Sequence, residues 1–163
     1  MKILTALLML SLSLFTPASA AAGYSHPQVE QLLAAEHEPD GVVFEVLAWD
    51  RNTWSWAAPM IADLRGQLRQ KYPDLPVAIV SHGGEQFQLT QERAAQQPGA
   101  IAQLTGLVGE GVDLHVCGAH SLWNQVPLDD YIDIVDVAPS GPARVNDYVA
   151  LGYTLILLRD PPE

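Results

Sequence analysis

Cysteine is almost missing from this chain. Cys117 is the only one among 163 residues, so no disulfide can form within a single molecule. Basic residues are also scarce, because eight Lys and Arg stand against 19 Asp and Glu and leave a formal net charge of −11. Such a composition lacks the clustered basic side chains of a nucleic-acid-binding surface, and we therefore expect no nucleic-acid partner.

Residues 1–20 have the pattern of a cleaved signal peptide. Lys2 gives a positive start, an apolar run extends from Ile3 to Phe15, and Ala18-Ser19-Ala20 fits the small-residue rule for cleavage. The apolar run is shorter than a membrane-spanning helix requires, and no basic stop-transfer cluster follows it; a retained anchor is the alternative. We predict that residues 1–20 are removed, that the mature chain is periplasmic, and that it has no membrane association.

The rest of the chain alternates between strand-like and helix-like segments. We expect a lead-in over residues 21–40, one domain over residues 41–158 and a tail over residues 159–163. Apolar runs bounded by turn residues predict strands at 42–47, 76–81, 112–116, 132–137 and 154–158. Strands that alternate with helices in this way predict an α/β fold with a parallel sheet and helices on both faces.

Two connecting segments are less regular. Trp49 and Trp54 follow the first strand, and we expect them in a loop, where they are candidates to wall a pocket. Residues 86–97 are polar and are expected to be mostly loop with some helix.

Cys117 follows an alternating strand and precedes Gly118 and a short helical segment. Open α/β sheets bind ligands at the carboxyl edge of their strands, and a helix N-terminus favours negative charge. This position favours the thiolate and makes Cys117 a candidate nucleophile. The alternatives for a lone thiol are an intermolecular bond, a metal ligand or an inert buried side chain.

Other polar residues and glycines are predicted at the same edge. His82 and Gly83 end the second strand, and Ser140 and Gly141 precede the last helix, which Ser140 is placed to cap. His120 lies one helical turn after Cys117, so it is a candidate to stabilise the thiolate or to act as its base. His115 shares a strand face with Cys117, and we expect it to pack rather than react.

Four segments in this order resemble the DsrE/DsrF-like family of sulfur-relay proteins, over residues 41 to 158. They are Val80-Ser81-His82-Gly83-Gly84, the stretch from Gly111-Val112 to Val116-Cys117-Gly118, the stretch from Val135 to Pro139-Ser140-Gly141, and Leu151-Gly152-Tyr153. Many exported relatives read Cys-Gly-Asn-Thr, whereas here Gly118 is followed by Ala119-His120-Ser121.

The resemblance implies a three-layer α/β/α fold with a mainly parallel five-stranded sheet, assembled as a trimer or hexamer. It implies that Cys117 carries sulfur as a persulfide, received from a donor and passed to an acceptor, which are proteins or small sulfur species. We expect Cys117 and His120 to be the catalytic residues. The expected substrate-binding residues are His82, Gly83, Gly118, Ser140 and Gly141.

Two other functions fit the same residues. Cys117 with His120 and His82 offers the sulfur and imidazole ligands that copper or zinc prefers, although paired ligand spacings are missing. An oligomeric scaffold without chemistry is the third possibility. The sulfur-handling prediction needs no cofactor and no resident metal.

Overall fold

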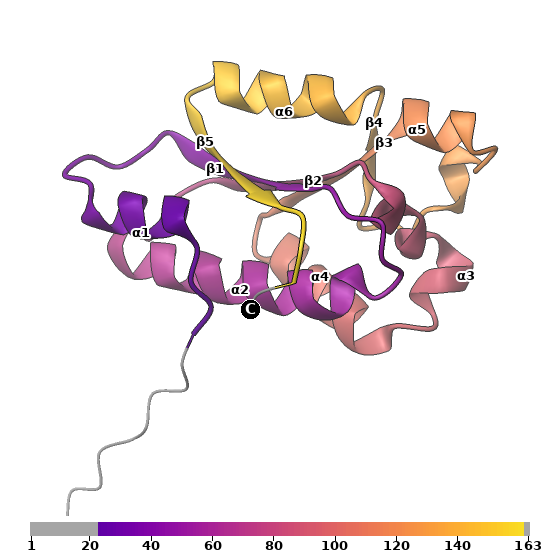
Figure 1. Ribbon diagram of the computed structural model, residues 1–163, viewed down its shortest axis with the longest axis horizontal. Helices are drawn as coiled ribbons and strands as arrows, with labels where there is room; N and C mark the ends of the chain where they lie inside the picture. The colour runs from indigo at the N-terminus through magenta and orange to yellow at the C-terminus, as the bar shows by residue number, and fades with distance from the viewer. Residues whose placement is uncertain (1–22, 162–163) are drawn as a thin grey trace, which may run out of the picture.

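Five parallel strands form the central sheet of this computed structural model, which describes residues 23–161 (Figure 1). The strands lie in the order β4-β3-β2-β1-β5, and all four neighbouring pairs are parallel. Their bounds are β1 Gly41–Val46, β2 Val77–Ser81, β3 Asp113–Cys117, β4 Asp136–Ala138 and β5 Tyr153–Leu158.

Helices cover both faces of this sheet, as Figure 1 shows. One face carries α1 (Pro27–Ala34), α2 (Thr53–Lys71) and α4 (Pro98–Gly109). The other carries α6 (Gly141–Ala150) and the short α5 (Gly118–Trp123). The connections add η1 (Gly84–Leu89), α3 (Gln91–Ala94) and η2 (Leu128–Asp130). The predicted three-layer α/β/α fold with a five-stranded parallel sheet is confirmed.

The two faces of the sheet bury different amounts of apolar surface. Phe44 and Ile79 point into the larger core under α2, where Ile61 and Leu64 are also fully buried. Strand side chains alternate between faces, so the intervening residues meet α6 in a smaller core. Its buried members are Val43, Ala78, Val80, Val145 and Tyr148.

Helix α6 connects β4 at one edge of the sheet to β5 at the other, and it packs across β3, β2 and β1 on the way. The hydroxyl of Ser140 accepts the Ala143 N–H at 3.4 Å, so Ser140 caps the helix as predicted. Gly152 ends it with φ of +89°, a conformation that glycine adopts without a Cβ penalty. The N-terminus of α6 therefore lies at the carboxyl edge of the sheet.

The predicted strand at 132–137 was wrong in its extent, because β4 includes only Asp136–Ala138. The Val135 N–H closes a turn on the Ile132 carbonyl at 3.0 Å. Ile134 and Val135 are partly buried against the main core without pairing in the sheet. Their apolar side chains are accounted for by this packing, without any strand pairing.

Trp54 was also placed incorrectly. It lies in the first turn of α2 with no exposed surface, and its indole N–H donates to the Glu85 carbonyl at 3.1 Å. Trp49 does lie in the loop after β1 and is 74% exposed.

Among the described residues that precede β1, one helix adds to the core. In the lead-in, α1 buries Val29 and Leu32 against the rest of the domain. The predicted signal peptide, residues 1–20, lies outside the described residues. Within residues 23–161, no helix combines the length and apolar character that a bilayer span requires.

Candidate functional site

Cys117 ends β3 and immediately precedes α5, as the strand and helix patterns predicted. Its Sγ accepts the backbone N–H of His120 at 3.4 Å, so the sulfur caps the first turn of this helix. The residue is 5% exposed.

A buried side chain holds the backbone of Cys117 from η1. The Gln86 Oε1 accepts the Cys117 N–H at 3.0 Å, and the Gln86 Nε2 donates to the Cys117 carbonyl at 3.2 Å. The same amide reaches the Ser121 hydroxyl at 3.1 Å and the Tyr131 hydroxyl at 3.3 Å. Burial raises the pKa of Tyr131, which keeps that hydroxyl protonated and neutral in this cluster.

The Cys117 side chain lines a cavity of about 260 Å³ at the carboxyl edge of the sheet. Trp123 on α5 is 81% exposed, and with Trp49 it forms an aromatic part of the wall. The other lining residues are His82, Ala119, His120, Ser140 and Pro142. The structure thus brings together four of the predicted site residues: Cys117, His120, His82 and Ser140.

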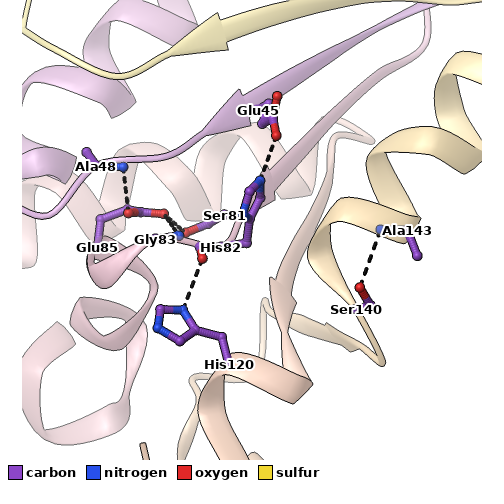
Figure 2. A network of polar contacts seen from close by, with 9 residues as sticks. All are labelled: Glu45, Ala48, Ser81, His82, Gly83, Glu85, His120, Ser140 and Ala143. Carbon is purple, nitrogen blue, oxygen red and sulfur yellow. Dashed lines mark hydrogen bonds and ion pairs between the residues drawn. The ribbon is translucent and has the colours of Figure 1, made fainter. Parts of the chain in front are cut away.

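The His120 ring crosses from α5 to the loop after β2. Its Nδ1 lies 3.0 Å from the His82 carbonyl (Figure 2). The ring packs against Phe87 and Trp49, with centroids 5.0 and 5.8 Å away. A carbonyl can only accept, so Nδ1 carries the proton and Nε2 keeps its lone pair when the ring is neutral. The ring thus connects α5 to the loop after β2.

His82 contacts a carboxylate that sequence reasoning missed. Its Nε2 lies 2.7 Å from Oε1 of Glu45 on β1, and the two side chains are 10% and 16% exposed. Figure 2 shows the His82 ring directed toward Glu45 and the His120 ring below it at the His82 carbonyl. Glu45 interrupts the apolar run of β1, and that interruption was the available signal.

The three predicted glycines are buried and permit close packing around the cavity. A Cβ on Gly141 would come within 2.5 Å of the His82 Cβ and 3.1 Å of the Cys117 Cβ. One on Gly118 would come within 3.1 Å of the Ala138 carbonyl. Gly83 is packed against Glu85 and Ala48 instead and does not line the cavity.

A buried carboxylate, also missed from sequence, holds the loops after β1 and β2 together. Glu85 has no exposed surface, and it accepts hydrogen bonds from Ala48 N at 2.9 Å, Gly83 N at 3.0 Å and the Ser81 hydroxyl at 2.7 Å (Figure 2). Burial raises its pKa, although these hydrogen bonds act in the opposite direction. Glu85 supports the site without lining the cavity.

His115 packs as expected, two residues before Cys117. Its Nε2 lies 2.8 Å from the Tyr148 hydroxyl, and its Nδ1 lies 2.8 Å from the Asp136 carboxylate. Burial lowers the pKa of His115 despite the nearby Asp136, so the ring favours the neutral form.

Metal binding finds no support in this geometry. Within the described part of the chain, no group of three or more His, Cys, Asp or Glu side chains is arranged to hold a metal ion. The arrangement instead places the Cys117 sulfur against a helix N–H, in a cavity that His82 and His120 also line, which suits nucleophilic chemistry at sulfur.

Comparisons with known proteins address the fold alone. Neither the family models nor the curated proteins include a match. Among solved structures, the chain is similar to a protein of unknown function, MTH1491 from Methanobacterium thermoautotrophicum. The TM-score is 0.59 at 20% identity, and the match covers 72% of this chain and 97% of that chain.

Proposed function

We propose that this chain is an exported sulfur carrier, which accepts sulfur on Cys117, holds it as a persulfide and passes it to an acceptor. The observation that carries the proposal is the structural environment of the Cys117 thiol. Its Sγ accepts a helix N–H, its side chain lines a cavity, and its backbone is held at both polar atoms by Gln86. The resemblance of the segments around Cys117 to DsrE/DsrF-like sulfur-relay proteins supports the same function.

The proposed chemistry is an exchange between thiolates. The Cys117 thiolate attacks the outer sulfur of a donor persulfide, R–S–S–H, and the bond between the two donor sulfurs breaks. The donor leaves as R–S⁻, and Cys117 keeps the outer sulfur with its hydrogen as a persulfide. An acceptor thiolate then attacks that sulfur and restores the Cys117 thiolate, so neither step requires an external oxidant or reductant.

Mass spectrometry tests this proposal. The folded, reduced protein is incubated with a polysulfide donor, and the mass of the peptide containing Cys117 is measured. We expect a gain of one sulfur atom on Cys117 and none in Cys117→Ser. A thiol that is alkylated readily but gains no sulfur would contradict the carrier role. A thiol that is alkylated only after unfolding would make Cys117 an inert core residue.

Assembly as a trimer or hexamer is part of the proposal. Large apolar side chains on α5 and at the end of α6 support it, because Leu122 and Leu151 are 62% and 66% exposed. Sedimentation velocity of the processed protein at micromolar concentration provides the test, and a single monomeric species would contradict this part of the proposal.

A further inference from the structure

A second cavity lies at the carboxyl edge of the sheet, beside the ends of β1 and β5. Its volume is about 490 Å³, within the range of small-molecule sites in proteins. The loop after β1 and the start of α2 line one part of it. The chain after β5 lines the rest, where it runs toward α2 (Figure 1). Among the described residues, Trp49 is the one that lines both this cavity and the smaller cavity of Cys117.

Hydrogen bonds hold the base of the larger cavity in place. The pairing of β1 with β5 continues past both strands, because the Leu47 N–H donates to the Leu158 carbonyl at 3.0 Å. The Ala48 N–H donates to the buried Glu85 carboxylate at 2.9 Å. The buried Thr53 hydroxyl donates to the Asp50 carbonyl at 2.6 Å. The loop after β1 is therefore fixed at both of its ends, and the cavity is already formed without a ligand.

Three charged side chains line this cavity without pairing with one another. They are Asp50, Arg159 and Asp160, and all three are exposed. None of them takes part in an ion pair with any residue in the range 23–161. A guanidinium binds a carboxylate through two parallel hydrogen bonds, and a carboxylate binds an ammonium group. The cavity therefore offers a ligand one cationic contact and two anionic contacts.

Two indole rings supply the apolar part of the lining. Trp56 on α2 is half-buried and packs against the main core. Trp49 lies over Gly84, where an added Cβ would be 2.9 Å from the Trp49 Cε3, and its ring meets the edge of His120 at a centroid distance of 5.8 Å. Indole rings provide large apolar contact areas, and their faces attract cations.

We propose that this cavity is a second ligand site, and that its ligand is a small zwitterion with an apolar body, of the size of an aromatic amino acid. Arg159 binds the carboxylate of the ligand. Asp50 and Asp160 bind its ammonium group, and the two indoles contact its apolar body. A ligand with a single charge would satisfy only one of the two kinds of charged contact. The site is separate from the proposed sulfur transfer, because the Cys117 thiol does not line it.

Isothermal titration calorimetry of the folded protein with L-phenylalanine and L-tryptophan tests this inference. We expect saturable binding of both amino acids. Two analogues of L-phenylalanine then measure the charged contacts: 2-phenylethylamine lacks the carboxylate, and 3-phenylpropionate lacks the ammonium group. Each should bind roughly tenfold more weakly, because a hydrogen-bonded charged contact is lost.

Substitutions at exposed positions assign each contact to a residue. Arg159→Gln should weaken L-phenylalanine roughly tenfold and leave 2-phenylethylamine unaffected, because that analogue has no carboxylate to lose. Asp50→Asn removes the charge, and its amide oxygen can still accept the Asn52 N–H that Asp50 accepts at 3.2 Å. It should weaken L-phenylalanine and not 3-phenylpropionate. The matched control Arg93→Gln, at an exposed position of α3, should leave all affinities unchanged.

Trp123→Ala determines which cavity the ligand occupies, because Trp123 lines only the smaller one. We expect this variant to bind L-phenylalanine as the parent does. The inference is overturned if neither amino acid binds, or if L-phenylalanine and its two analogues bind equally well. It is also overturned if Trp123→Ala weakens binding and Arg159→Gln does not. Sulfur loading plays no part in these measurements, so they leave the proposed carrier function to its own test.

Discussion

The carboxamide of Gln86 pairs with both polar backbone atoms of Cys117, at 3.0 Å to its N–H and 3.2 Å to its carbonyl. These residues are 31 positions apart in the sequence, so the contact ties η1 to the junction of β3 and α5. Gln86 therefore positions the thiol that we propose as the sulfur carrier, although Gln86 does not line the cavity.

Replacing Gln86 by Leu tests this support. The change leaves the Cys117 N–H buried without its acceptor, and we expect the free energy of unfolding to fall by about 1–3 kcal/mol. Urea titration measures the loss. The matched control is Gln96→Leu at an exposed position, which we expect to stay within about 0.5 kcal/mol of the parent. Equal losses in both variants would contradict the role of Gln86.

Replacing Gly141 or Gly106 by Ala should change the free energy of unfolding in opposite directions. The new Cβ at position 141 would lie 2.5 Å from the His82 Cβ, and we expect a loss of about 1–3 kcal/mol as α6 shifts. At position 106 in α4 the Cβ meets nothing within 4 Å, and we expect a gain of roughly 0.5–1 kcal/mol. Thermal or urea unfolding of the two variants checks this, and a stabilising Gly141→Ala would show that the contact is not tight.

Glu85 should make stability depend on pH. Burial raises its pKa above the usual 4.5, so the folded chain holds a proton that the unfolded chain has already released. Stability from this group is full below pH 4.5 and decreases as pH rises through the raised pKa. We expect the unfolding free energy of the parent, relative to Glu85→Gln, to decrease over that range.

The exposed Glu92→Gln is the control for this pH dependence, because it removes a carboxylate without changing the buried one. Urea unfolding at a series of pH values gives both differences. If the parent and Glu85→Gln curves stay parallel from pH 4 to pH 8, Glu85 does not carry the effect.

Trp123 should limit which reagents reach Cys117. It is 81% exposed yet lines the cavity, so Trp123→Ala should change stability by no more than about 0.5 kcal/mol. We expect the alkylation rate to increase more for a bulky maleimide than for iodoacetamide. A ratio of the two rates that matches the parent would show that Trp123 does not restrict access.

We predict that residues 1–20 are removed as a signal peptide, so that the mature protein begins at Ala21 or within about two residues of it. Intact-mass measurement on protein from its native host checks the amino terminus. An abundant form that retains Met1 would contradict both the processing and the periplasmic location.

The sequence predicted the strand–helix alternation well because apolar runs report burial directly. It placed Cys117 correctly for the same reason, since the alternation from Val112 to Val116 ends there. It failed at β4, where Ile134 and Val135 pack against the core without joining the sheet. Apolar alternation shows that side chains are buried, and it does not show which backbone pairs with which.

The polar supports of the site were beyond sequence reasoning. Gln86 and Glu85 lie in a segment whose composition is typical of a solvated loop, yet neither side chain has any exposed surface. Several of their partners are backbone atoms, of Cys117, Ala48 and Gly83, and backbone N–H and carbonyl groups are present at these positions whatever the side chain. Whether such a polar side chain is buried against backbone or faces solvent depends on the tertiary fold, which the local sequence does not show.

The strand order also determines when the domain can finish folding. β1 pairs with β2 on one side and with β5 on the other. The first strand of the domain therefore cannot complete its pairing until the last strand has been made. Pairings of such long sequence separation form slowly, and until β5 arrives β1 has one unpaired edge. A chain emerging from a ribosome or a translocation channel therefore cannot complete its sheet before residue 158 is free.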